Sequence, residues 1–234
     1  MRVGGVHHHR DVQDGTVRAA VFGISDGLVS NVALILGIAG ASTDPSIVRV
    51  AGISGLLAGA VSMAAGEYVS LKAQKELVER ELIIEQESIE DNFKAETAEL
   101  VAIYEGRGVD SDLAEEVVKQ IMSNPDVALD VHIREELGVD PAKLGNPVMA
   151  ALSSFVSFSL GAFVPVVPWL AGGGNSAVWI SAISGVTATA VVGAVLAVFS
   201  DRSVFRTSLR QMLIAAGACS ATYLIGSFLG TNIG

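Results

Sequence analysis

Five stretches of this chain are long and apolar enough to cross a lipid bilayer, which takes about 20 residues per helix. They cover approximately residues 17–41, 47–71, 148–170, 177–199 and 209–229. Of all residues, 50% are hydrophobic and 17% are charged, and the 25 glycines suit closely packed membrane helices. A soluble protein that buried all five stretches would need more polar sequence to cover them. We therefore predict an all-α membrane protein with five transmembrane helices.

The charged residues are concentrated in one segment between the second and third stretches. From Lys72 to Lys143 the chain has 19 acidic and 8 basic residues, whereas the remainder has 6 acidic and 7 basic residues. The net charge of −10 argues against a nucleic-acid partner. We predict a polar N-terminal segment (1–16), two membrane helices (17–71), an acidic helical metal-binding domain (72–146) and three further membrane helices (147–234).

The positions of lysine and arginine predict the orientation in the membrane, because these residues favour the cytosolic side. Arginines precede the first stretch, two lysines and an arginine follow the second, and Arg202, Arg206 and Arg210 separate the fourth from the fifth. This pattern predicts a cytosolic N-terminus, a cytosolic acidic domain and an external C-terminus. Pro165 and Pro168 are expected to end the third membrane helix.

The acidic segment has the pattern of a small helical domain. The second membrane helix has no breaker at its end and is expected to continue to about Glu90. Three shorter helices are predicted over about 93–105, from Ser111 or Asp112 to Asn124-Pro125, and over 126–137. Apolar residues at helical spacing are expected to face the domain core; they are Leu113, Val117 and Ile121 in one helix and Leu129, Ile133 and Leu137 in the next.

Several carboxylates of this segment fall within or beside the apolar faces of its predicted helices. They are Glu81, Glu85, Glu96, Glu99 and Glu136, and His132 lies one turn from the last of them. Inward-facing carboxylates repel one another and lose hydration, and a shared cation removes both penalties. Oxygen ligands with one imidazole suit Fe²⁺, Mn²⁺ or a similar divalent ion. The alternative is that these glutamates lie on solvated helix faces.

Two membrane helices contain carboxylates, which are costly there and usually functional. Asp26 lies within the first, and Met63 and Glu67 lie one turn apart in the second, at comparable depth. Two carboxylates and a thioether suit a borderline transition metal, and the carboxylates can exchange that metal for protons. The alternative is a structural hydrogen bond or an inert, protonated acid. His7-His8-His9 is a further candidate for collecting metal, or a polar terminus.

Three segments resemble a known family. Residues 21–31, Val-Phe-Gly-Ile-Ser-Asp-Gly-Leu-Val-Ser-Asn, are similar to the first-helix signature of the vacuolar iron transporter family. Residues 63–70, Met-Ala-Ala-Gly-Glu-Tyr-Val-Ser, resemble its second-helix signature, and residues 222–226 resemble its last helix. The resemblance extends from about Asp14 to the C-terminus.

The resemblance implies a homodimer of five-helix subunits that exports Fe²⁺, and often Mn²⁺, from the cytosol in exchange for protons. It implies that Asp26, Met63 and Glu67 lie on the transport path. In the cytosolic domain, the glutamates that match the family's metal ligands are Glu85, Glu96, Glu99 and Glu136. Ser88 stands at the position of a family glutamate, for which Glu81 is a candidate substitute. His132-Ile133 replaces a methionine pair, so His132 is a candidate replacement ligand.

The predicted function is therefore proton-coupled export of Fe²⁺ or Mn²⁺ by a multi-pass integral membrane protein that is not an enzyme. The metal is cargo, and no prosthetic group is expected. The membrane is expected to be the plasma membrane in a prokaryote and the vacuolar membrane in a eukaryote. Two alternatives remain open: a membrane-tethered metal sensor or storage protein, and a ferroxidase that uses Glu96, Glu99, His132 and Glu136.

Overall fold

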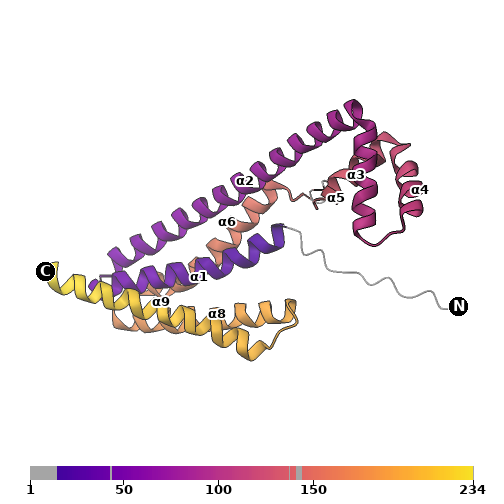
Figure 1. The fold of residues 1–234 in the computed structure, drawn as a ribbon. Helices are drawn as coiled ribbons and strands as arrows, with labels where there is room; N and C mark the ends of the chain where they lie inside the picture. Colours follow the sequence, from indigo (N-terminus) through magenta and orange to yellow (C-terminus); the bar gives the residue numbers. More distant parts are fainter. Residues whose placement is uncertain (1–14, 43, 137, 141–143, 234) are drawn as a thin grey trace. The chain divides into compact units, whose positions relative to one another are not determined.

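The computed structural model describes residues 15–42, 44–136, 138–140 and 144–233, so His7-His8-His9 lies outside the described residues (Figure 1). These residues form helices and turns without a strand. They divide into two compact units, which we call the membrane unit (residues 14–70 and 145–234) and the acidic unit (residues 71–144). Helix α2 (Pro45–Asp91) contributes residues to both units.

Among the described residues, five helical segments are long and apolar enough to cross a membrane. They are α1 (Gly15–Ala41), α2, the segment from α6 (Pro147–Phe163) to α7 (Val167–Ala171), α8 (Asn175–Phe199) and α9 (Val204–Ile233). Each agrees closely with an apolar stretch predicted from the sequence. Helix α1 packs against α6, α8 and α9, and its Val32 and Ile35 belong to a core cluster that includes Trp169.

The expectation that Pro165 and Pro168 end the third membrane helix holds in part, because α6 ends at Phe163 and the span ends at Ala171. The helical path continues beyond α6 through a 3-10 turn, η2 (Val164–Val166), into α7. Each proline occupies one of the first two positions of its segment. The amide hydrogen that proline lacks has no helical partner there, so the chain changes pitch without leaving the membrane span.

Helices α1 and α6 approach each other so closely that neither accommodates a side chain at their crossing. A Cβ atom on Gly27 would collide with the backbone oxygen of Phe158, and one on Gly161 would collide with that of Ile24. Both obstacles are backbone atoms of the facing helix, so the collision is relieved only by separating the helices. The two glycines therefore set the distance between α1 and α6.

We expect Gly161→Ala to destabilise the membrane unit by about 1–3 kcal/mol or more, the usual cost of overpacking. Thermal unfolding of the detergent-solubilised protein measures this change, with the loss of the folded peak in size-exclusion chromatography as the signal. Gly217→Ala in α9 is the matched control, because a Cβ atom there meets nothing within 4 Å. Equal melting temperatures for the two variants would contradict the role assigned to this crossing.

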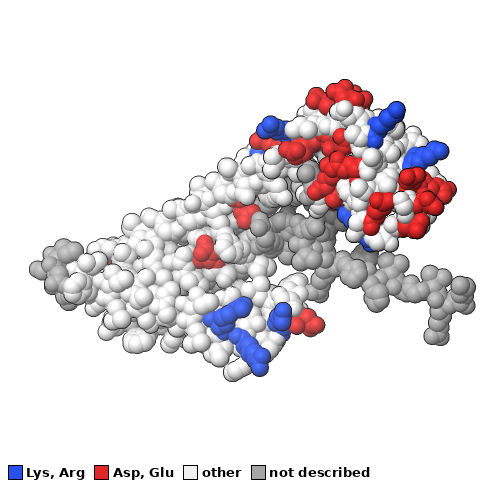
Figure 2. Space-filling view, in the orientation of Figure 1, with Lys and Arg blue, Asp and Glu red and all other residues white. Residues whose placement is uncertain are grey.

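The acidic unit consists of the last part of α2 with α3 (Phe93–Gly106), α4 (Ser111–Met122) and α5 (Pro125–Glu136). Its core is formed by Leu100, Val118, Met122 and Ala128. Acidic side chains crowd the surface around α3 and α4, whereas the surface of the membrane unit is mostly uncharged (Figure 2). This unit therefore has a small apolar centre beneath a strongly negative surface.

The predicted inward face of α4 is partly wrong. Leu113 and Val117 are 54% and 39% exposed, and the buried row lies one position further along, at Ala114, Val118 and Met122. Ile121 does pack against the core. The small side chain of Ala114 permits close packing, which the periodicity of the larger apolar residues did not indicate.

Candidate metal-binding sites

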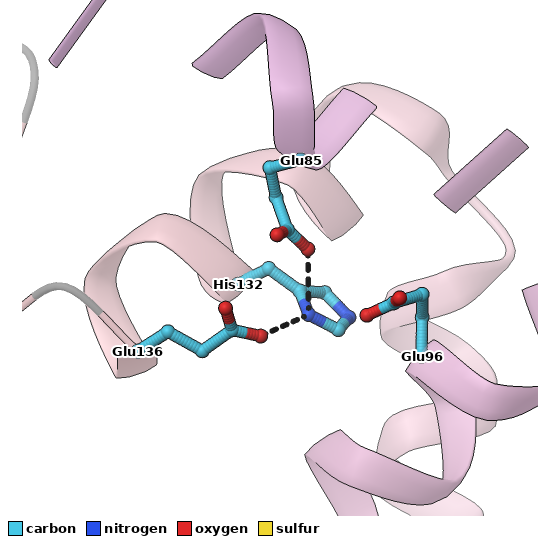
Figure 3. Close-up of side chains that lie close together, drawn as sticks. All are labelled: Glu85, Glu96, His132 and Glu136. Atoms are coloured by element: carbon cyan, nitrogen blue, oxygen red, sulfur yellow. Dashed lines mark hydrogen bonds and ion pairs between the residues drawn. The ribbon is translucent and has the colours of Figure 1, made fainter. Parts of the chain in front are cut away.

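Four ligand-bearing side chains converge in the acidic unit, from three helices. Glu85 lies on α2, Glu96 on α3, and His132 and Glu136 on α5, and one potential ligand atom of each lies within 4.8 Å of all the others. Figure 3 shows the three carboxylates directed at the imidazole ring. We call this group the glutamate–histidine cluster. Because residues distant in sequence meet here, the arrangement depends on the fold of the whole unit.

His132 is the centre of the cluster and is fully buried. Its Nδ1 lies 3.1 Å from Glu136 Oε1, with hydrogen-bond geometry, and 3.2 Å from Glu85 Oε1 (Figure 3). Its Nε2 is also buried and has no hydrogen-bond partner among the described residues. With the proton on Nε2, the Nδ1 lone pair faces the same space as the oxygens of Glu85 and Glu136, so one metal ion there would meet the imidazole and these carboxylates together.

The cluster has an excess of negative charge. Among the described residues, no lysine or arginine forms an ion pair with Glu85, Glu96 or Glu136, whereas Glu135, next to Glu136, pairs with Arg107. Burial raises the pKa of the Glu85 carboxyl, and the charges of Glu136, Glu96 and Glu99 raise it further against the opposing effect of His132. A divalent cation would relieve the repulsion and compensate for the lost hydration.

The donor set fits a divalent transition metal. Three carboxylates and one imidazole suit Fe²⁺ or Mn²⁺ better than a soft ion, because carboxylate oxygens are hard donors. Of the six residues predicted for this site, four come together. The exposed Glu99 influences Glu85 by its charge but lies outside the group, and the half-buried Glu81 also lies outside it.

We expect Glu85→Gln to raise the melting temperature of the metal-free protein at neutral pH. A carboxyl whose pKa is raised by folding favours the folded state below its unfolded pKa and loses that contribution as the pH rises through its folded pKa. The glutamine side chain of the variant carries no charge at any pH, so the variant does not lose stability in this way as the pH rises. Thermal unfolding in a chelator at pH 5 and 7 measures the effect, and the stabilisation should be larger at pH 7. A lower melting temperature for the variant at both pH values would contradict the prediction.

The three intramembrane residues predicted from the sequence line two cavities that share residues. Asp26 and Met63 line one cavity of about 340 Å³, and Met63 and Glu67 line a second of about 300 Å³. Phe22 and Met63 border both, so Met63 lies where the two cavities meet. The thioether of Met63 on α2 therefore borders both the cavity of Asp26, on α1, and the cavity of Glu67, on α2.

Asn31 also lines the first cavity and was not predicted as a site residue. Its buried Nδ2 donates to the backbone oxygens of Ala162 (2.6 Å) and Gly52 (3.2 Å), which ties α1 to α6 and α2. Its buried Oδ1 has no hydrogen-bond partner among the described residues. A polar amide in the middle of an apolar helix was the available signal, because such a group needs partners within the protein.

The five long apolar helices define a multi-pass helical membrane protein. Residues 17–227 match the model of the VIT family. The chain is 33% identical to vacuolar iron transporter 1 of Eucalyptus grandis, over 88% of this chain and 84% of the relative. It is 35% identical to the vacuolar iron transporter of Acanthamoeba castellanii (91% and 78%) and 31% identical to vacuolar iron transporter 1 of Arabidopsis thaliana (89% and 84%).

This chain belongs to the VIT family. The family assignment confirms the resemblance found in its first, second and last membrane helices. The relatives are transporters and not enzymes, so the ferroxidase alternative is set aside.

Proposed function

We propose that this protein carries Fe²⁺, and also Mn²⁺, from the cytosol across its membrane in exchange for protons. The observation that carries the proposal is the pair of cavities in the membrane unit, which the carboxylates of Asp26 and Glu67 and the thioether of Met63 line. Carboxylates in an apolar environment need a compensating positive charge. The names of the relatives, vacuolar iron transporters, support iron as the cargo.

The acidic unit acts as the cytosolic collecting site in this proposal. Its net negative surface attracts divalent cations, and the glutamate–histidine cluster has the donor set for Fe²⁺ or Mn²⁺ (Figure 2). The metal is captured there before it enters the membrane, so export runs from the cytosol outward.

Proton exchange follows from the chemistry of the carboxylates. Asp26 and Glu67 bind a metal only when deprotonated, and each becomes neutral again by taking up a proton once the metal has left. Alternate loading with a metal ion and with protons keeps the cavity close to electrical neutrality in both states. Protons therefore move in the direction opposite to the metal.

A homodimer is the proposed assembly. Asp26 and the neighbouring Phe22 are exposed on the single chain, and Phe22 is 62% exposed. A carboxylate in contact with acyl chains is unfavourable, so a second copy that covers this surface would remove the cost. The vacuolar membrane is the proposed location in a eukaryote, as the names of the relatives indicate, and the plasma membrane in a prokaryote.

Reconstituted full-length protein in liposomes tests the proposal. With acidic liposome contents, external Fe²⁺ or Mn²⁺ should enter faster than without a pH gradient, and the interior should become less acidic as metal enters. An equal rate of metal entry with and without the pH gradient would contradict proton coupling. Absence of entry under every gradient would overturn transport itself.

A metal sensor or storage protein remains the second candidate, because the glutamate–histidine cluster would suffice for it. This alternative predicts metal binding by the reconstituted protein without any metal entering the liposomes.

A further inference from the structure

The last 90 residues of the chain contain four charged side chains, and all four line one cavity. Asp201, Arg202, Arg206 and Arg210 border a space of about 630 Å³ at the turn between α8 and α9. Basic side chains gather beside an acidic one in this part of the membrane unit (Figure 2). Three hydroxyl-bearing residues, Ser200, Ser203 and Thr207, complete its polar lining. We call this space the arginine cavity.

Backbone geometry holds the arginine cavity in place. Helix α8 ends with Asp201 in the left-handed region (φ 51°), and the amide of Arg202 donates to the carbonyl of Ala197 at 2.9 Å. This is the hydrogen bond of a Schellman-type helix end. Farther from the turn, Ser208 Oγ donates to the carbonyl of Ala190 at 2.9 Å, and a Cβ atom on Gly193 would lie only 2.7 Å from Ser208 Cα. The walls of the cavity are therefore tightly packed helices.

The arginines have no compensating charge within the described part of the chain. None of Arg202, Arg206 and Arg210 forms an ion pair with a described residue, and Asp201 is the single acidic residue of the lining. Arg206 and Arg210 are four residues apart on α9, so they lie on one side of the helix, where their charges repel one another. Arg206 also lies in the first turn of α9, where the helix dipole disfavours a cation. A bound anion would relieve both costs.

The surroundings of the cavity are apolar. Phe205 is 75% exposed, and Phe199 and Leu209 are exposed as well. An anion that binds beside such side chains at the end of a membrane span gains from having apolar chains of its own, which separates a lipid from a small soluble ion. Three positive charges against one negative charge match a phosphate monoester, which carries about −1.5 to −2 at pH 7.

We propose that the arginine cavity binds the headgroup of an anionic phospholipid with a phosphate monoester, such as phosphatidic acid. Arg202, Arg206 and Arg210 hold the phosphate oxygens, and the acyl chains lie against Phe205 and Leu209. One guanidinium group donates two parallel hydrogen bonds to two oxygens of a phosphate. This geometry gives arginine a selectivity for phosphate that a general positive charge lacks. The lipid fastens the α8–α9 turn at the membrane surface.

Thermal unfolding of the full-length protein in a neutral detergent, with added lipid, tests the proposal. We expect a saturable rise in melting temperature with dioleoyl phosphatidic acid, a smaller rise with phosphatidylglycerol and no rise with phosphatidylcholine. Native mass spectrometry should detect one bound phosphatidic acid per chain. A rise with phosphatidylcholine equal to that with phosphatidic acid would overturn the proposal. An equal effect of glycerol 3-phosphate would assign the cavity to a soluble phosphate and overturn the lipid assignment.

Paired variants separate a binding site from a general orientation signal. Arg206→Gln with Arg210→Gln should weaken phosphatidic acid binding at least about tenfold, since both lost guanidinium groups would have donated charge-assisted hydrogen bonds to the phosphate. Arg206→Lys with Arg210→Lys keeps the positive charge and should still bind less tightly than the unchanged protein. Arg49→Gln, outside the cavity, is the control and should bind normally. Unchanged binding by the double glutamine variant would overturn the site.

Discussion

Proteoliposomes that contain Asp26→Asn should transport Fe²⁺ at less than about one tenth of the unchanged rate. Asparagine keeps the shape and a carbonyl oxygen at the wall of the cavity shared with Met63, but it removes the negative charge that a divalent ion needs in an apolar environment. The amide also does not take up a proton on metal release, so the pH gradient should accelerate the residual flux less than it accelerates transport by the unchanged protein. Initial rates of metal entry, measured with and without the gradient, give both results.

Asp44→Asn is the matched control for this experiment. Asp44 lies just before α2, its Oδ1 accepts a hydrogen bond from the amide of Ser46 at 2.7 Å, and asparagine serves equally well at such a helix start. The same chemical change there should leave transport intact. Both variants should elute from size-exclusion chromatography like the unchanged protein. Transport at full rate by Asp26→Asn would contradict the assignment of the cavity as the metal path.

His132→Leu should lower the affinity of the glutamate–histidine cluster for Mn²⁺ by at least about tenfold. Leucine fills the fully buried position but supplies no nitrogen ligand, and it removes the partner that orients Glu136. Electron paramagnetic resonance of free Mn²⁺, titrated against the full-length protein, measures the affinity. His7, His8 and His9 are replaced by alanine in all samples. The two proteins compared then differ only in the presence or absence of the single remaining histidine, His132.

Two adjacent glutamates provide the control for the cluster. Glu136→Gln should weaken Mn²⁺ binding, whereas Glu135→Gln should not, because Glu135 is paired with Arg107 and lies outside the cluster. The two substitutions are chemically identical and neighbour one another on α5. Equal losses for both would show that general negative charge binds the metal, and an unchanged affinity in His132→Leu would remove the imidazole from the ligand set.

Local features of the sequence were enough to determine the membrane spans and the helices of the acidic unit. Apolar length predicts the spans because a bilayer core requires about 20 residues per helix, and cap residues such as Asn146 mark where helices begin. The carboxylates Asp26 and Glu67 were evident because charge is rare in apolar segments.

Only the tertiary structure decided which side chains meet. Helical periodicity offers adjacent faces, and the choice between them depends on the partner helix, so Ala114 rather than Leu113 is buried in α4. For the same reason Glu85 and Glu96 approach His132 while Glu81 and Glu99 stay outside the cluster. The two anchoring hydrogen bonds of Asn31 also join groups distant in sequence. Hydrophobicity and helix signals act over a few turns, whereas a binding site requires atoms from separate helices at one point in space, and helix packing alone determines that point.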